Sequence, residues 1–210
     1  MQITPLAADD DSAFNQMFAL YTQAIEASER KPRAAIAAYV RDPRCRILLA
    51  REAGAVQAFA MLFYPSSAGF WLLDYLAVDA TLRSQGMGAR MFAAASADAA
   101  TRGARPCLIE IDQPGAAVSP GNDPIARAAF YRRLGCRRLQ GLDYVLPLDV
   151  AGTPPPMQVL VHGALGPFSK ATVHQWLTAL YTEVYDRPAD DPRIAAMLHD
   201  LPDLIATSGD

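Results

Sequence analysis

Lysine is scarce in this chain of 210 residues: 19 residues are basic, but only Lys31 and Lys170 are lysines. The net charge of −3 and the pI near 5.6 give no excess of positive charge. They therefore argue against nucleic acid as a partner, because nucleic acid usually requires a basic face. Five arginines do fall between residues 127 and 138. They indicate either a site for a small anion or a solvated helix face.

Cysteine and long apolar runs are also rare. The three cysteines lie far apart in the sequence, at Cys45, Cys107 and Cys136. This odd number at wide spacing matches neither a disulfide framework nor a zinc site, so we expect no metal and a reducing cytoplasm. The longest nearly apolar run, Ala55 to Tyr64, is shorter than the roughly 18 residues of a membrane span. The first twelve residues lack a secretion signal, so we expect a cytoplasmic protein without a membrane partner.

Apolar residues are abundant, and their spacing predicts both strands and helices. The chain is 51% hydrophobic, which is enough for a substantial core and excludes general disorder. Strands are predicted over residues 2–6, 45–51, 55–64, 70–78, 107–112 and 157–162, and one or two strands with a possible turn at Gly141 are predicted within residues 138–148. Helices are predicted over residues 12–27, 34–40, 88–102, 123–134 and 173–184, with a last short helix from residue 191. This order predicts an α/β (α+β) protein with helices on both faces of a mixed sheet.

The segment Leu73 to Met91 carries the clearest chemical signal. A predicted buried strand passes through a short loop, Arg83-x-x-Gly86-x-Gly88, directly into a helix. Glycine lets the backbone approach a ligand, and the first N–H groups of a helix have no internal partners and attract anions. The loop therefore favours a phosphate or pyrophosphate, although a simple tight turn would have the same residues. A dinucleotide fingerprint is disfavoured by Met91, and a Walker A loop by the absence of lysine after the second glycine.

Two motifs resemble those of the GNAT superfamily of N-acetyltransferases. Arg83-Ser84-Gln85-Gly86-Met87-Gly88-Ala89 resembles the family's acyl-CoA signature, and the run from Phe130 to Cys136 resembles its helix with a tyrosine, a basic residue and glycine. The resemblance covers residues 3–149 and implies a GNAT-like, mostly antiparallel sheet in a domain over residues 1–150. Residues 151–210, which begin with a Pro-rich linker, would be a C-terminal strand-helix extension docked on the same domain.

The resemblance implies acetyl-CoA as co-substrate. The strand end would bind the pantetheine through its main chain, the loop N–H groups would bind the pyrophosphate, and arginines would add charge. The residues implied are Leu76, Ala77, Val78, Arg83, Ser84, Gln85, Gly86, Met87, Gly88, Ala89, Arg90 and Arg133.

Three residues are predicted to be catalytic. The resemblance places Tyr131 at the position of the acid that protonates the thiolate leaving group. Asp74 and Glu110 are candidate bases, because a carboxylate inside an apolar strand is costly unless it is paired or functional. A paired structural carboxylate is the alternative for each. Period-two counting along the strand places Asp74 on the same face as Leu76 and Val78.

The predicted function is transfer of an acetyl group from acetyl-CoA directly to the amine of a small molecule or peptide. In the resemblance, the loop that contains Glu29 and Arg30 borders the acceptor pocket, so both are predicted substrate residues. The alternative is a catalytically inactive module that binds CoA or a protein; the complete loop together with Tyr131 favours the enzyme. The apolar stripe predicted within residues 173–184 would cover either this chain's own sheet or a second copy in a homodimer.

Overall fold

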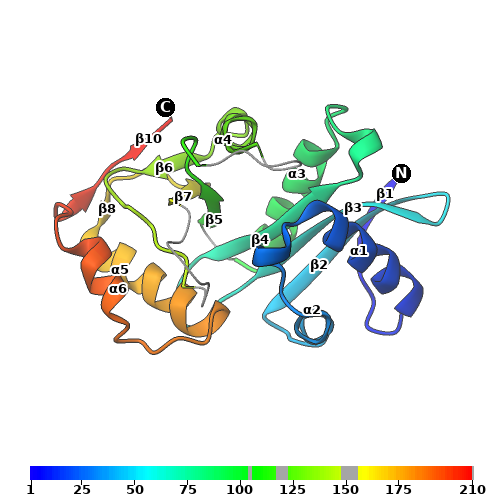
Figure 1. Cartoon of the computed structure of the whole chain (residues 1–210), viewed down its shortest axis with the longest axis horizontal. Helices are drawn as coiled ribbons and strands as arrows, with labels where there is room; N and C mark the ends of the chain where they lie inside the picture. Colours follow the sequence, from blue (N-terminus) through cyan, green and yellow to red (C-terminus); the bar gives the residue numbers. More distant parts are fainter. Residues whose placement is uncertain (104–105, 117–122, 148–155, 210) are drawn as a thin grey trace. The chain divides into compact units, whose positions relative to one another are not determined.

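The computed structural model describes residues 1–103, 106–116, 123–147 and 156–209 (Figure 1). The chain forms two compact units, one from Met1–Tyr64 and Leu72–Ala104, the other from Pro65–Trp71 and Arg105–Asp210. The expected domain boundary at residue 150 and most of the predicted linker lie outside the described residues.

The first unit contains four antiparallel strands in the order β1-β2-β3-β4. Their bounds are Gln2–Pro5 for β1, Cys45–Glu52 for β2, Ala55–Phe63 for β3 and Trp71–Val78 for β4. Strands β2 and β3 form the predicted hairpin, whose turn holds Ala53 and Gly54 at positive φ. Each strand lies within one or two residues of its predicted range.

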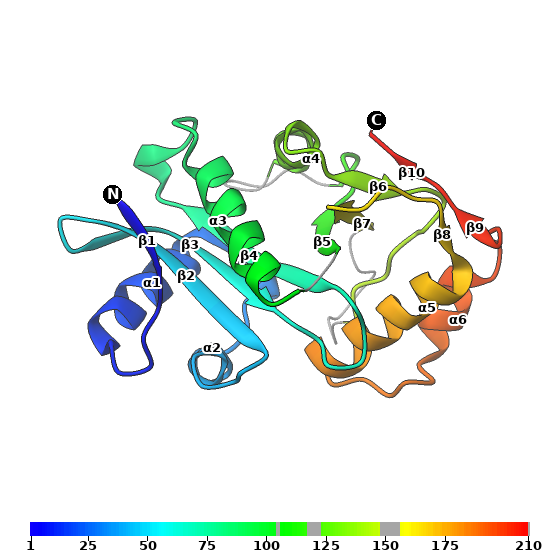
Figure 2. The same cartoon turned by 180° about the vertical axis from the view of Figure 1, so that it is seen from behind.

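Helices cover both faces of these strands. Their bounds are Asp11–Ala24 for α1, Arg33–Tyr39 for α2 and Met87–Thr101 for α3, with the short 3₁₀ turns η1 (Ala27–Glu29) and η2 (Ala80–Leu82). Figures 1 and 2 show α1 and α2 on one face and α3 on the other. The core beneath α1 and α2 is fully buried at Tyr21, Ile36, Leu49, Phe59 and Met61. Burial of such large side chains contributes about 1.5–3 kcal/mol each.

A β-bulge interrupts β4 at Asp74. The register with β3 pairs Met61 with Tyr75 and then Leu62 with Leu73, so it skips Asp74. An extra residue in one strand breaks the strict alternation of faces and re-aims a side chain.

The bulge turns Asp74 toward α2. Its carboxylate contacts Lys31 and Tyr39 on the face that also packs Tyr75. Leu76 follows Tyr75 in regular register and therefore points to the opposite face. The prediction that Asp74 shares a face with Leu76 and Val78 was wrong, because period-two counting assumes an uninterrupted strand.

In the described part of the second unit, strands β5, β7, β6 and β10 pair antiparallel in that order. Their bounds are Cys107–Asp112 for β5, Met157–His162 for β7, Arg137–Leu139 for β6 and Thr207–Ser208 for β10. Of the one or two strands predicted within residues 138–148, the described residues form β6 and, beyond Gly141, an isolated bridge at Tyr144. Strand β7, expected in the extension, lies between β5 and β6.

Three helices and a small two-stranded sheet complete the second unit. Their bounds are Pro124–Arg133 for α4, Lys170–Ala179 for α5 and Pro192–Leu198 for α6, with Phe168–Ser169 for β8 and Leu204–Ile205 for β9. Helix α5 continues as a π-helix, η3 (Leu180–Val184). The predicted stripe is buried at Val173, Trp176, Leu177, Leu180 and Tyr181. The Trp176 ring packs edge-on against Phe70 and Phe168, so residues of the same unit cover the stripe.

None of the helices in the described ranges is long and apolar enough to cross a membrane.

Candidate functional site

The glycine-rich loop ends at the N-terminus of α3. Gly86 is the N-cap residue with φ 78°, in the left-handed region that glycine adopts without strain. Among the described residues, no side chain hydrogen-bonds to this cap. The first helical hydrogen bond runs from the Arg90 N–H to the Gly86 carbonyl at 3.1 Å. The N–H groups of Met87, Gly88 and Ala89 precede that bond, so they have no partners within the helix.

Most side chains of this loop face solvent. Arg83, Ser84, Gln85 and Arg90 are exposed, whereas Met87 is buried and anchors the helix start. Two side chains fold back onto the backbone before the loop: Arg83 Nε donates to the Val78 carbonyl at 3.4 Å, and Gln85 donates to the Thr81 carbonyl at 3.2 Å. Two guanidinium groups and the positive end of the α3 dipole therefore lie along one short segment, an arrangement that attracts anions.

Asp74, the first candidate base, is a paired carboxylate. Its side chain is only 4% exposed, and its Oδ2 accepts hydrogen bonds from Lys31 Nζ at 2.6 Å and from the Tyr39 hydroxyl at 3.0 Å. Lys31 Nζ also donates to the Tyr39 hydroxyl oxygen at 2.7 Å. It lies 5.0 Å from the ring centroid of Tyr39 and 5.1 Å from that of Tyr75. Asp74, Tyr39 and Tyr75 thus surround the ammonium group with a carboxylate, a phenol oxygen and one aromatic ring.

The two tyrosines beside Asp74 remain protonated phenols. Burial raises the pKa of Tyr39 and of Tyr75, and the negative charge of Asp74 raises both further. Both phenols are therefore neutral. The Tyr39 hydroxyl oxygen accepts the ammonium N–H, and the Tyr75 ring keeps the electron-rich face that attracts a cation.

The predicted substrate residues lie in the segment that carries Lys31. The backbone carbonyl of Glu29 accepts a hydrogen bond from the Tyr75 hydroxyl at 2.9 Å, and the Lys31 N–H donates to the Tyr21 hydroxyl at 2.7 Å. Arg30 is exposed, and its Nε donates to the carbonyl at the C-cap of α1 at 2.6 Å. Tyrosine hydroxyls thus fix the backbone of this segment against β4 and α1.

Glu110, the second candidate base, lies on β5 in the second unit and is hydrogen-bonded to two tyrosines. Its Oε1 accepts a hydrogen bond from the Tyr144 hydroxyl, and its Oε2 accepts one from the Tyr185 hydroxyl at 2.7 Å. Burial raises the pKa of Tyr144, and the nearby Glu110 raises it further. Each carboxylate oxygen of Glu110 therefore has a phenol donor from the C-terminal part of the chain.

Tyr131, the candidate acid, lies within α4 and is 7% exposed. Burial raises the pKa of its phenol, and the charge of Arg127 opposes this only in part. Tyr131 therefore holds its proton at neutral pH, as a proton donor must. Arg133, two residues later in the same helix, is exposed.

Sequence reasoning missed the side chains that surround both carboxylates. Lys31 and Tyr39 are 43 and 35 residues from Asp74, and Tyr144 and Tyr185 are 34 and 75 residues from Glu110. No local spacing connects residues so far apart. The rarity of lysine was the one signal that could have directed attention to Lys31.

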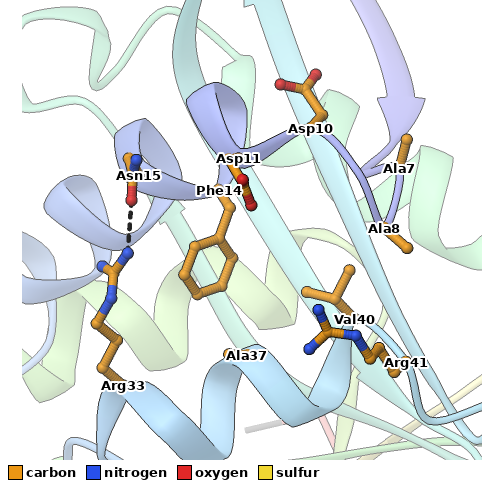
Figure 3. Close-up of a pocket in the computed structure, with 10 residues that line it drawn as sticks. All are labelled: Ala7, Ala8, Asp10, Asp11, Phe14, Asn15, Arg33, Ala37, Val40 and Arg41. Atoms are coloured by element: carbon orange, nitrogen blue, oxygen red, sulfur yellow. Dashed lines mark hydrogen bonds between the residues drawn. The ribbon is translucent and has the colours of Figure 1, made fainter.

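A pocket of about 380 Å³ opens elsewhere in the first unit, between the start of α1 and α2 (Figure 3). Arg33 and Asn15 line it and are joined by a hydrogen bond of 2.5 Å. Asp10, also in the lining, caps α1 and pairs with Arg51 at 2.8 Å. This pocket contains none of the predicted site residues. Within the described ranges, no group of three or more His, Cys, Asp or Glu residues is placed to hold a metal ion.

The fold and the loop together define an α/β protein whose bulged strand leads into an uncapped, glycine-initiated helix. The sequence model of the acetyltransferase (GNAT) family matches residues 13–136, and the chain belongs to this family. No curated protein matches the chain.

Solved structures share the fold. A GNAT-family protein from Bacteroides thetaiotaomicron is 20% identical, with TM-score 0.68, over 90% of this chain and 100% of that chain. The aminoglycoside 6'-N-acetyltransferase from Enterococcus faecium is 18% identical, with TM-score 0.58, over 77% and 96%. A GNAT-family acetyltransferase from Elizabethkingia anophelis, with acetyl-CoA bound, is 15% identical, with TM-score 0.50, over 77% and 96%.

Proposed function

We propose that this protein is an acetyl-CoA-dependent N-acetyltransferase that acts by direct transfer on the amine of a small molecule or peptide. The observation that carries the proposal is the uncapped N-terminus of α3, with Gly86 at φ 78° and three N–H groups ahead of the first helical bond. Such a terminus fits the pyrophosphate of acetyl-CoA. Family membership and the acetyl-CoA bound to the Elizabethkingia anophelis protein support the same co-substrate.

The N–H groups of residues 84–89 would hold the pyrophosphate, and Arg83 and Arg90 would add positive charge. The main chain of Leu76 and Val78 would bind the pantetheine. Acetyl-CoA supplies a thioester, and a backbone N–H near Val78 would stabilise the oxyanion that forms as the amine attacks its carbonyl.

Two proton transfers complete the chemistry. The acceptor must lose a proton before it attacks, and Asp74 or Glu110 would accept it. The thiolate that leaves must gain one, and Tyr131 would donate it, since burial keeps its phenol protonated.

A module that binds CoA without catalysis is the second candidate function. One observation favours it: both candidate bases already accept hydrogen bonds from side chains of this chain. Titration with acetyl-CoA by calorimetry, followed by a free-thiol release assay with a panel of amines, separates the two. The enzyme binds acetyl-CoA and releases thiol faster with at least one amine. Binding without any amine-dependent release would favour the module, and absence of binding would refute both.

We also propose that the protein acts in the cytoplasm. Its three cysteines are buried and form no disulfide bonds, as is common in a reducing compartment.

A further inference from the structure

The surroundings of the Lys31 ammonium have the chemistry of a cation-binding site. A carboxylate and the Tyr39 phenol oxygen accept its N–H groups at 2.6 and 2.7 Å, and the neutral Tyr75 ring lies 5.1 Å from it. Aromatic faces within about 6 Å of a cation, together with a carboxylate, are the groups with which proteins recognise organic ammonium ions. We call Asp74, Tyr39 and Tyr75 the ammonium cage.

The fold itself does not require an ion pair at this point. A buried ion pair contributes little to stability compared with apolar side chains of similar size. Asp74 reaches α2 only because the bulge turns it there, and bulges of this kind are over-represented beside active sites. Once a carboxylate is 4% exposed, however, it needs a cation, and Lys31 supplies one.

The backbone of Lys31 is held independently of its side chain. Its N–H donates to the Tyr21 hydroxyl at 2.7 Å, so rotation of the four-carbon side chain would not require the segment to move. The side chain is 18% exposed and therefore already borders solvent. If another ammonium ion enters as Lys31 leaves, Asp74 keeps a positive partner and the charge of the cage does not change.

From these observations we propose that the ammonium cage is the acceptor subsite and that Lys31 fills it in the resting protein. The acceptor is a primary alkylammonium ion that displaces the Lys31 side chain. A primary ammonium has the N–H groups that Asp74 and Tyr39 accept, whereas a quaternary ammonium has none. This inference rests on the proposed function.

The chemical step balances with these groups. The bound ammonium gives one proton to Asp74, and its nitrogen then attacks the thioester carbonyl carbon. A C–N bond forms, the C–S bond breaks, and the sulfur takes a proton from Tyr131. The nitrogen loses its second proton as the amide forms, and this proton restores the Tyr131 phenol. Asp74 releases its proton to solvent when the product leaves, so that overall one proton moves to CoA and one to solvent.

Binding of n-butylammonium, measured by calorimetry without acetyl-CoA, tests the cage alone. We expect weak binding to the wild-type protein, binding at least tenfold tighter to Lys31→Ala, and none to Asp74→Asn. Lys170→Ala, which removes the same charge elsewhere, should bind like wild type. Butyltrimethylammonium should bind to none of them. If n-butylammonium binds to Lys31→Ala but not to wild type at any accessible concentration, Lys31 is a fixed structural partner and the inference is wrong.

Kinetics with acetyl-CoA and n-butylamine, cadaverine or spermidine test whether the same cage serves the reaction. Lys31→Ala should lower the KM for the amine at least tenfold with little change in kcat, and Lys170→Ala should change neither. A purely structural Lys31 would instead lower kcat or leave KM unchanged, and either result would overturn the proposal. Acetyl-CoA affinity is measured separately for every variant. If wild type binds no acetyl-CoA, the proposed function fails, while the calorimetric result with n-butylammonium still decides the cage.

Discussion

Replacing Gly86 by valine tests the cofactor loop most directly, because the chain offers a matched control. Gly86 and Gly54 have almost the same backbone conformation, with φ of 78° and 82°, and a Cβ built on either meets no other atom within 4 Å. Gly54 lies in the turn of the β2–β3 hairpin, outside the segment that precedes α3. Gly86→Val and Gly54→Val should therefore impose the same backbone strain.

The magnitude of the strain follows from that conformation. A residue with a Cβ costs about 1–2 kcal/mol in the left-handed region. In a protein of this size each kcal/mol lowers Tm by about 2–4 °C. Both variants should therefore unfold at similar, slightly reduced temperatures with the fold retained. Only Gly86→Val places a side chain beside the N–H groups that would hold the pyrophosphate. We expect it to lose acetyl-CoA affinity well beyond tenfold, a factor equivalent to about 1.4 kcal/mol.

Calorimetric titration with acetyl-CoA and thermal unfolding of wild type and both variants check this prediction. Unchanged affinity in a folded Gly86→Val protein would refute the assignment of the loop. An equal loss of affinity in Gly54→Val would show that backbone strain lowers the affinity for acetyl-CoA, and that the valine side chain does not act by occupying the space of the pyrophosphate.

Three further predictions concern other parts of the chain. Tyr131→Phe should lower kcat by about 10²–10⁴, the range for a general acid, with acetyl-CoA affinity unchanged; a wild-type kcat in the thiol-release assay would reduce Tyr131 to a packing residue. Burial of Glu183 raises its pKa, but hydrogen bonds from Ser67 and Ser66 outweigh this and lower it from 4.5 to about 2. Its stabilising effect is therefore complete above about pH 4.5 and is lost toward pH 2, so the Tm deficit of Glu183→Gln should be largest near pH 7 and disappear near pH 2. A deficit independent of pH would contradict this. A chain that ends at Thr153 lacks β7, which pairs with both β5 and β6, and should therefore fail to fold its second unit. A soluble fragment with unchanged kinetics would show that residues 157–200 are a separate part of the protein. A change from dimer to monomer would show that these residues face a second copy.

Local patterns predicted most of the elements. The spacing of apolar residues placed α1 and α3, although α3 begins at Met87, one residue before the predicted start, because Gly86 caps it at φ 78°. The buried stripe of α5 followed from the same reasoning. These features depend on residues close together in the sequence, and the spacing of apolar residues along the chain reflects which of them are buried.

The site was less accessible to sequence reasoning because its contacts are long-range. The bulge at Asp74 depends on how β3 and β4 pair, which no spacing within β4 reveals. The partners of Asp74 and Glu110 come from distant elements. A carboxylate in an apolar strand was a sound reason to select both residues, but it did not predict which side chains would surround them.

The near absence of lysine also makes the protein a convenient chemical reporter. Amine-reactive reagents can modify only two side chains, and the ammonium of Lys170 bonds to the backbone carbonyls of His199 and Leu201. Lys31 is enclosed by tyrosines and Asp74. The labelling rate at Lys31, followed by mass spectrometry, therefore measures how often its side chain leaves the enclosure, with no engineered probe.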